Sequence, residues 1–344
     1  MDGMSPGDGG GRIGLAHGNG GRLTRELIEA VFAAGLGGLL VDHRADAVAV
    51  PWDGEEGELV LTTDAFTVQP LEFPGGDIGA LAVHGIVNDL AVAGATPRYL
   101  TLDVLIEEGL ELERLRRIVA SVARAARAAG VRVAAGDTKV VRRGEGGGLY
   151  LAATGVGVRP RGVSLGLGRI RAGDRVLVSG PVGDHGVAVM LAREDYGLRG
   201  GLASDCASVL PLTLAVRALG GLRFLRDPTR GGLATVCHEI AAATGLTVRL
   251  EEAAIPLRDP VRGVCEMLGY DPLYLACEGR VVAVAAPGAA EEVLAAWRAL
   301  PQGRAAAVIG TVTERGGAPV VLETALGGER ALEELEDDPL PRIC

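Results

Sequence analysis

The feature that most constrains the fold is a break near the middle of the chain. Glycines and Pro160 make the segment from Arg159 to Arg171 typical of a linker, and a new strand-like run then begins at Arg175. On each side of this break, strand-like and helix-like runs follow one another in a mixed order. This order favours two α+β domains over one doubly wound sheet. The chain has 344 residues, which is long enough for two domains that each have their own core.

Hydrophobic periodicity and turn residues give the approximate element bounds. In the first half, strands are predicted near 58–62, 99–106, 131–135 and 149–158, with helices near 78–93 and 111–129. In the second half, strands are predicted near 175–179, 246–250, 280–286 and 305–313, with helices from about 185 and over 231–243. The predicted parts are a flexible glycine-rich loop (1–22), an N-terminal domain (23–165), a C-terminal domain (170–330) and a mobile tail (331–344).

Composition excludes several classes of protein. The net charge of −10, without a basic stripe interleaved with aromatic residues, argues against nucleic-acid binding. The sequence has no apolar run of membrane-spanning length and no N-terminal segment typical of a signal peptide, so we expect a cytoplasmic protein that does not enter a membrane. The cysteines form no CxxC pair, and we expect the four internal ones to be small buried residues. The cysteines are Cys206, Cys237, Cys265, Cys277 and Cys344.

The last residue, Cys344, is a candidate functional thiol. Pro339 and Pro341 favour an extended, semi-rigid arm, which from Ala331 would reach about 45 Å when fully extended. A thiol at the end of such an arm could enter a pocket and leave it again. The alternative is a frayed terminus that happens to finish in cysteine.

Lys139 is the only lysine, beside 33 arginines. Arginine would serve equally well if only positive charge were needed, whereas the amine of lysine can lose its proton when it is desolvated. Lys139 follows Gly136-Asp137-Thr138, directly after the predicted strand that ends at Ala135. We therefore interpret it as a catalytic or phosphate-contacting amine, with chance retention of one lysine as the alternative.

Aspartates at predicted strand ends and turns indicate a nucleotide site without a Walker loop. Carboxylates gathered at strand ends suit Mg²⁺, which prefers oxygen ligands and substrate phosphates. Each of these residues could instead be an ordinary turn or cap residue. The candidates are Asp46, Asp64, Asp137 and Asp227.

Asn88 and Asp89 form a polar pair inside an otherwise apolar helix. Residues 78–95 are apolar or small on nearly every face, as in a buried helix. A buried amide beside a carboxylate needs partners, because burial of an unpaired polar group is costly. We expect a metal or a phosphate as the partner, and another protein side chain is the alternative.

The sequence Asp227-Pro-Thr-Arg-Gly-Gly232 opens a predicted helix and indicates an anion site. Free N–H groups at the helix start, the helix dipole and Arg230 all favour a phosphate, and the glycines permit its close approach. Glu278 lies directly before a predicted strand. It is either a solvated turn residue or a general base that faces a pocket.

With these residues assembled, the chain closely resembles the carbamoyl dehydratases of hydrogenase maturation, the HypE family, over essentially its whole length. Several of the shared motifs also occur in the wider superfamily of aminoimidazole ribonucleotide synthetase, selenophosphate synthetase and thiamine monophosphate kinase. The terminal Pro-Arg-Ile-Cys is the mark specific to the HypE family. The motifs are His17-Gly-Asn-Gly-Gly21, Thr62-Thr-Asp64, Phe73-Pro-Gly-Gly-Asp-Ile-Gly79, Val87-Asn-Asp-Leu90, Gly136-Asp-Thr-Lys-Val140, Gly183-Asp-His-Gly186, Asp227-Pro-Thr-Arg-Gly-Gly232, Asp271-Pro-Leu-Tyr274 and Pro341-Arg-Ile-Cys344.

The resemblance implies a fold and an activity. It implies two domains, with the N-terminal domains of a homodimer pairing around a shared β-barrel, and ATP with Mg²⁺ in a cleft between the domains. The terminal cysteine would receive a carbamoyl group from the carbamoyltransferase HypF. ATP-dependent dehydration would then leave a thiocyanate, whose cyanide passes to iron on the HypC–HypD scaffold for a nickel–iron hydrogenase.

The resemblance also implies residue roles. Cys344 would carry the group, and Lys139 and Glu278 would remove its protons and orient it. Magnesium and phosphate would be held by Asp46, Asp64, Asp89 and Asp227. The nucleotide would also contact Gly18, Gly20, Gly21, Asn88, Asp137, Thr138, Thr229 and Arg230.

Three positions depart from the family pattern. Ile86 replaces a usual threonine, Cys277 a common asparagine and Arg280 a common lysine. The change at Cys277 removes a possible amide contact to the carbamoyl group.

Two rival functions fit the sequence less well. A selenophosphate synthetase would carry a reactive cysteine or selenocysteine in the glycine loop, and residues 9–21 contain none. A scaffold with a docking tail would not explain the aspartates or the single lysine.

Overall fold

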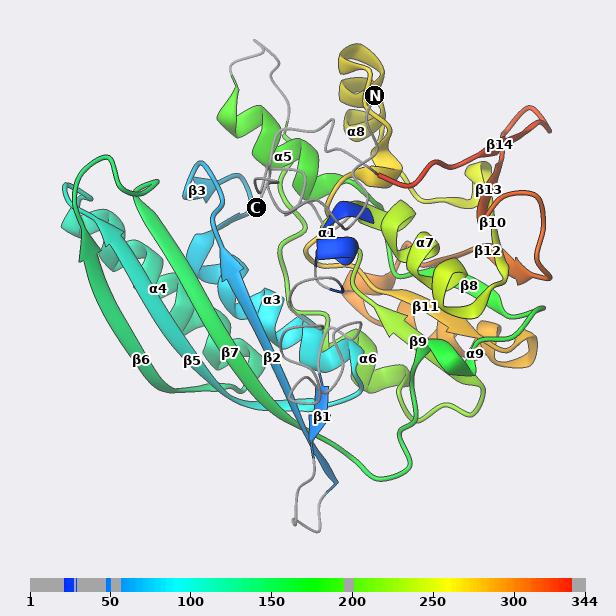
Figure 1. Ribbon diagram of the computed structural model, residues 1–344, viewed down its shortest axis with the longest axis horizontal. Coiled ribbons are helices and arrows are strands. Elements are labelled where there is room, and N and C mark those ends of the chain that lie inside the picture. The colour runs from blue at the N-terminus through cyan, green and yellow to red at the C-terminus, as the bar shows by residue number, and fades with distance from the viewer. Residues whose placement is uncertain (1–21, 28, 30–47, 51–56, 195–200, 336–344) are drawn as a thin grey trace.

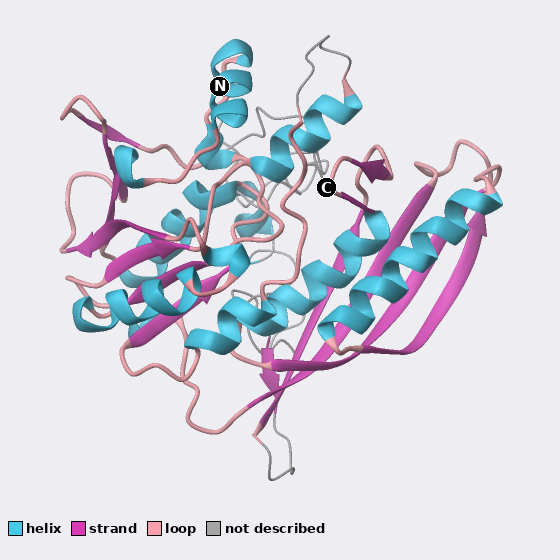
Figure 2. Ribbon diagram, turned by 180° about the vertical axis from the view of Figure 1, so that it is seen from behind, coloured by secondary structure: helices cyan, strands magenta, loops and turns pink. Residues whose placement is uncertain are grey.

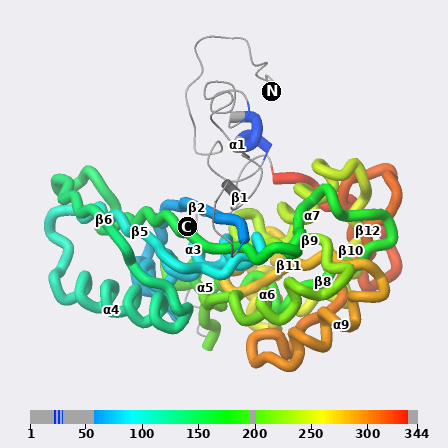
Figure 3. Tube along the Cα trace, turned by 90° about the horizontal axis from the view of Figure 1, so that it is seen from below, coloured from blue at the N-terminus to red at the C-terminus, as the bar shows by residue number. Residues whose placement is uncertain are grey.

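The two halves of the chain form two sheets that lie side by side (Figures 1 and 3). The computed structural model describes residues 22–27, 29, 48–50, 57–194 and 201–335. A short helix, α1 (Arg22–Leu27), precedes the sheets, and the hairpin of β3 (Glu72–Phe73) and β4 (Gly76–Asp77) leads into the helices of the first half.

The N-terminal sheet has five strands in the order β1-β2-β7-β5-β6. The β5–β6 pair is parallel and the other pairs are antiparallel. Helices α3 and α4 cover one face of the sheet, and among the described residues no helix covers the opposite face of β5 and β6 (Figures 2 and 3). The bounds are β1 (Val48–Val50), β2 (Glu58–Phe66), α3 (Ile78–Val92), β5 (Thr96–Glu107), α4 (Leu112–Ala129), β6 (Arg132–Val141) and β7 (Leu149–Arg159).

The C-terminal sheet has seven strands in the order β14-β13-β10-β12-β8-β11-β9, with β10 and β13 parallel. The strands are β8 (Arg175–Val178), β9 (Leu222–Arg226), β10 (Thr247–Glu251), β11 (Val282–Ala285), β12 (Ala307–Thr313), β13 (Val320–Glu323) and β14 (Glu329–Ala331). The helices are α5 (Asp184–Arg193), α6 (Leu210–Val216), α7 (Gly232–Thr244), α8 (Asp259–Leu268) and α9 (Pro287–Arg298), with short 3-10 turns η4 (Leu167–Arg169), η5 (Glu252–Ala254), η6 (Pro272–Tyr274) and η7 (Pro301–Gly303).

The core does not divide at the linker. Side chains of β8 and β11 alternate between the two faces of the C-terminal sheet, as successive residues of a strand must. Leu177 and Ala283 belong to a core that continues through α6 and α9 into α3 and α4 of the first half, whereas Val178 and Val282 pack with α7 on the other face. One core is therefore shared by the two halves, because α3 is apolar on nearly every face and packs against both, while a second core lies wholly within the C-terminal half.

Most predicted elements occur within a few residues of their expected bounds. Helix α4 ends at Gly130, whose left-handed conformation (φ 69°) suits glycine. The clear difference is β6, which was expected to end at Ala135 but continues to Val141. Asp137, Thr138 and Lys139 consequently lie within a strand rather than in a loop after it.

Candidate active site

The loop between β9 and α7, the predicted anion site, is packed closely against neighbouring backbone. Gly231 and Gly232 both have positive φ angles, 75° and 60°, at the start of the 13-residue helix. A Cβ atom on Gly232 would lie 2.6 Å from the carbonyl oxygens of Leu273 and Leu275, so no larger residue fits there. The loop is thus held against η6 with the positive end of the helix dipole at its surface.

Asp64 of β2 faces this loop across the junction between the halves. Its surface is accessible to solvent, yet it lies among enough protein atoms for desolvation to raise its pKa. The hydrogen bond from the Ala65 N–H and the positive charge of Arg230 both oppose that rise. The influence of Arg230 means that Asp64, a carboxylate of one half, lies within electrostatic range of the loop in the other half.

Asp89 of α3 lies on the same side of the N-terminal sheet. Its Oδ2 accepts a hydrogen bond of 2.6 Å from Thr62 Oγ1, and Asp64 follows Thr62 by two residues, so both strand side chains share one face. Asp227 is buried at the end of β9. Asp46 lies outside the described residues, as do Gly18, Gly20, Gly21 and Cys344.

The predicted magnesium ligands do not form a compact set within the described part of the chain. No three of its His, Cys, Asp or Glu side chains gather closely enough to hold a metal ion. Magnesium is nevertheless commonly held by one or two carboxylates together with substrate phosphates. The donors Asp64, Asp89 and Asp227 fit that chemistry as separate oxygen ligands around a nucleotide.

The residues on β6 are far from this junction, because β6 is the outer strand of the sheet (Figure 1). Lys139 Nζ lies 3.2 Å from Asp137 Oδ2, and both side chains are largely exposed. The pKa of Asp137 is lowered, first by the Thr138 N–H and then by Lys139. Within a single chain, the β6 residues Lys139, Asp137 and Thr138 therefore lie apart from Glu278.

Glu278 is buried, 5% exposed, just before β11. Its backbone N–H donates to Asp205 Oδ1 at 3.0 Å, and its carbonyl accepts from Asn88 Nδ2 at 3.1 Å. The alternative of a solvated turn residue is wrong, because the residue is enclosed by segments from both halves.

Asn88 has a different set of partners from the one expected. Its Nδ2 donates to the carbonyls of Ala207 and Glu278, both at 3.1 Å, and its Oδ1 accepts the Val209 N–H at 2.8 Å. Backbone groups thus satisfy the amide, which joins the halves. Asn88 is not a nucleotide ligand in this arrangement.

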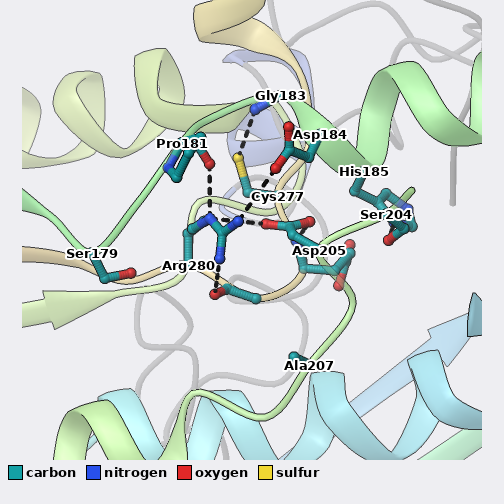
Figure 4. A network of polar contacts seen from close by, with 12 residues as sticks. Ser179, Pro181, Gly183, Asp184, His185, Ser204, Asp205, Ala207, Cys277 and Arg280 are labelled. Carbon is teal, nitrogen blue, oxygen red and sulfur yellow. Dashed lines mark hydrogen bonds and ion pairs between the residues drawn. The ribbon is translucent and has the colours of Figure 1, made fainter. Parts of the chain in front are cut away.

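A buried charge cluster beside Glu278 was not predicted (Figure 4). Arg280 Nη2 donates to Asp184 Oδ2 at 3.3 Å, and Arg280 Nε forms an ion pair with Asp205 Oδ2 at 3.4 Å. Burial is the main reason that the pKa of Asp184 rises to about 6, despite the nearby charges of Arg258 and Arg280. The Gly183-Asp-His-Gly186 motif was the available sequence signal, but a motif does not reveal its spatial partners.

Cys277 lies beside this cluster and is fully buried (Figure 4). Its Sγ accepts the Gly183 N–H at 3.2 Å, and burial raises the pKa of its thiol well above the usual value. Its side chain is therefore occupied inside the C-terminal half. Cys237 and Cys265 are also buried, as predicted, and Cys206 is partly buried.

The residues that lead into the tail are attached next to the anion loop. The Leu332 carbonyl accepts a hydrogen bond from His238 Nε2 at 2.8 Å, and the Glu333 carbonyl accepts one from Tyr274 Oη at 2.6 Å. The Leu335 carbonyl accepts the Arg22 N–H at 3.3 Å. The Glu334 carboxylate forms an ion pair with Arg25 of α1. A Cβ atom on Gly231 would come within 3.4 Å of the Leu335 side chain, which places this attachment beside α7.

Comparison with known proteins identifies the domains and the family of this chain. The N-terminal domain of AIR synthase related proteins matches residues 44–159, and their C-terminal domain matches residues 171–323. Carbamoyl dehydratase HypE of Azotobacter vinelandii is 47% identical over 335 residues, which cover 97% of this chain and 98% of the relative. The chain belongs to the HypE family.

Solved HypE structures have the same fold. A HypE–HypF complex contains a chain with a TM-score of 0.84 and 40% identity, covering 90% of this chain and 99% of that one. A HypE in complex with ATP has a TM-score of 0.80 and 42% identity, with 96% and 99% covered. Within the part of the chain that the structure describes, no helix has the length and apolar character needed to cross a membrane.

Proposed function

We propose that this chain is an ATP-dependent carbamoyl dehydratase that converts a thiocarboxamide on Cys344 into a thiocyanate. The observation that carries the proposal is the near-full-length identity of 47% to a carbamoyl dehydratase. The product would supply a cyanide ligand for a nickel–iron hydrogenase. The anion loop at α7 and the buried carboxylate Glu278 are the geometric features that support it.

The reaction needs phosphate transfer and the removal of two protons. The carbamoyl oxygen attacks the terminal phosphorus of ATP and releases ADP, and one N–H proton is lost. The C–O bond then breaks, phosphate leaves with the oxygen, and loss of the second N–H proton completes the carbon–nitrogen triple bond. Phosphorylation is required because an unmodified amide oxygen is a poor leaving group.

We assign the protein's contribution to two groups of residues. Glu278 accepts a proton in a water-poor environment, where a carboxylate is an effective base. Lys139 orients the carbamoyl group or takes the other proton. Asp64, Asp89 and Asp227, with Asp46, would hold Mg²⁺, which would spread the negative charge of the phosphates.

The nucleotide contacts are assigned in the same way. Thr229 and Arg230 at the start of α7, with the glycine loop, would bind phosphate. Asp137 and Thr138 lie on β6 and would join the site only through a second copy of the chain.

The assembly proposed is a homodimer that pairs through the open N-terminal sheets around a shared β-barrel. Tyr99 and Leu105 are large apolar residues that β5 leaves exposed on this open face. Pairing would cover them and would give Lys139 new neighbours. HypF as carbamoyl donor and the HypC–HypD scaffold as cyanide acceptor complete the proposal, with the cytoplasm as the place of action.

The test is the mass of the C-terminal peptide after incubation with HypF, carbamoyl phosphate and ATP, with Cys344→Ala as control. Addition of a carbamoyl group followed by ATP-dependent loss of one water, confined to Cys344, is expected. An unmodified tail while ATP is consumed on another acceptor would contradict the proposal.

A second variant tests the amine. Lys139→Arg keeps the positive charge but cannot readily lose a proton. Dehydration should fall sharply in this variant, with Lys139→Gln as the neutral comparison. Near-normal dehydration by Lys139→Arg would remove the base role from Lys139.

A further inference from the structure

We propose that Asp205, Arg280 and Asn88 are positioning residues that fix Glu278 for proton removal, and that Asn88 makes this position depend on contact between the two halves. The inference rests on the proposed role of Glu278 as a base. It goes beyond that role because it assigns the placement of the carboxylate to three residues that need not contact the substrate.

Asp205 holds the N–H side of Glu278. Its Oδ1 accepts the Glu278 N–H at 3.0 Å, while its Oδ2 faces the guanidinium of Arg280. Oδ1 is thus hydrogen-bonded, whereas Oδ2 is buried without a hydrogen bond and interacts with Arg280 only through charge. Gly279 permits the approach, because a Cβ atom there would lie 2.0 Å from the Asp205 carbonyl oxygen.

Arg280 is itself held by hydrogen bonds, so the positive charge that it presents to Asp205 has a fixed position (Figure 4). Its Nε donates to the Pro181 carbonyl at 2.8 Å, its Nη1 to the Gly279 carbonyl at 3.2 Å and its Nη2 to Asp184 at 3.3 Å. A planar guanidinium with several fixed donors can hold these groups at once. Because its side chain is only 9% exposed, water does not compete strongly for these contacts.

Asn88 holds the carbonyl side of Glu278 from α3. The same amide also binds the Ala207 carbonyl and the Val209 N–H, so it fixes the segment that carries Asp205. Residues of both halves therefore form hydrogen bonds with the backbone N–H and carbonyl of Glu278. A change at this contact would move the base and not only loosen the junction.

The first variant is Asp205→Asn. The asparagine side chain has only one oxygen. This oxygen can either accept the Glu278 N–H or face the Arg280 guanidinium, but it cannot do both. Misplacement of a reacting group by about 1 Å can cost on the order of 100-fold in rate. We expect dehydration of enzyme already carbamoylated on Cys344 to slow by about 10- to 100-fold in a single turnover, with ATP affinity unchanged.

Asp174→Asn is the matched control. Asp174 is also a buried aspartate, whose Oδ2 accepts the Arg171 N–H at 2.8 Å and lies 3.7 Å from Arg223 Nε. It precedes β8, at the opposite end of that strand from Arg280. We expect it to change thermal stability comparably but to leave the dehydration rate within about twofold of wild type. An equal loss of rate in both variants would overturn the proposal.

Arg280 provides a second pair of variants in case Asp205→Asn does not fold. Arg280→Lys retains a positive charge between Asp184 and Asp205, whereas Arg280→Met leaves two buried carboxylates without it. The lysine variant should therefore dehydrate at least tenfold faster than the methionine variant at equal ATP affinity. Equal rates in the two variants would contradict the positioning role.

Glu278→Gln separates this inference from the proposed function. If Glu278→Gln abolishes dehydration while Asp205→Asn and Arg280→Met react at the wild-type rate, the base is retained and the positioning role is wrong. If Glu278→Gln itself reacts normally, the proposed role of Glu278 is wrong, and the inference fails with it.

Discussion

The strands β6 and β11 provide opposite environments for the two proposed proton acceptors. β6 carries Lys139 and is exposed along nearly its whole length, whereas β11 follows Glu278 and is completely buried. Among the described residues, Lys139 pairs with the exposed side chain of Asp137, and exposed ion pairs fix geometry weakly. Glu278 is held by hydrogen bonds from both halves of its own chain.

The difference teaches that one chain preorganises only part of this site. The buried part has its geometry set by packing and by satisfied polar groups, and substitutions there should affect stability as well as catalysis. The exposed part takes its geometry from whatever covers β6. Substitutions there should affect association and activity but leave the folded chain intact.

The largest expected effect on stability is at the buried anion loop. Gly232→Ala combines a left-handed backbone, which costs about 1–2 kcal/mol for alanine, with overpacking against backbone atoms, which costs about 1–3 kcal/mol. The free energy of unfolding should fall by about 3 kcal/mol in denaturant titrations. The matched control is Gly130→Ala, where φ is 69° and a Cβ atom meets nothing within 4 Å. Equal losses in the two variants would remove the distinction between the regions.

A smaller effect is expected from pH, through His185 of α5. Burial lowers the pKa of His185 to about 4, against an ordinary value of 6.5. The unfolded chain therefore binds a proton first, so this contribution to stability is present above pH 6.5 and is lost as the pH falls towards 4. When the pH falls from 7 to 5, the free energy of unfolding should decrease by about 2 kcal/mol less in His185→Gln than in wild type.

Asp184 should act with the opposite sign. Its pKa is raised to about 6 from 3.8, so the folded chain binds a proton at this site before the unfolded chain does. The contribution of Asp184 to stability therefore rises as the pH falls through 6. Asp184→Asn should therefore lose more stability than wild type over the same pH range. Identical pH profiles for wild type, His185→Gln and Asp184→Asn would mean that neither group is perturbed in the folded chain.

The smallest effect on the folded chain is expected on the open face of the N-terminal sheet. Tyr99 of β5 is 46% exposed there, so Tyr99→Asp should change the thermal midpoint of the isolated chain only slightly. In a dimer that covers this face, the same change buries an unpaired charge and should weaken self-association at least tenfold in sedimentation measurements. Val119→Asp, on an exposed side chain of α4, is the control. Unchanged association of Tyr99→Asp would place the interface elsewhere.

The elements and the anion loop could be predicted because their signals are local. The apolar helix α3, the glycine at the end of α4 and the glycine pair before α7 each follow from short-range rules. The extent of β6 could not be predicted in this way. Gly136 is typical of a strand end, but it lies within the strand. A Cβ atom there would approach the Leu102 carbonyl oxygen to 2.3 Å, so the position needs glycine for packing and not for a turn.

The environment of Glu278 depended on contacts that are distant in sequence. Asn88 was correctly identified as a buried amide that needs partners, but its partners are backbone groups more than a hundred residues away. Asp205 lies in a segment without regular secondary structure, so no periodicity distinguishes it. The single lysine drew attention to Lys139, yet the sequence does not show that its strand is exposed.

The attachment of the chain at Leu335 has a kinetic consequence. Cys344 is nine residues further on, so its sulfur cannot lie more than about 30 Å from that point. Confinement to such a volume corresponds to a local concentration in the millimolar range. Delivery of the modified thiol to the site would then be first order and independent of enzyme concentration, while exchange of the thiol with outside partners would remain second order and sensitive to dilution.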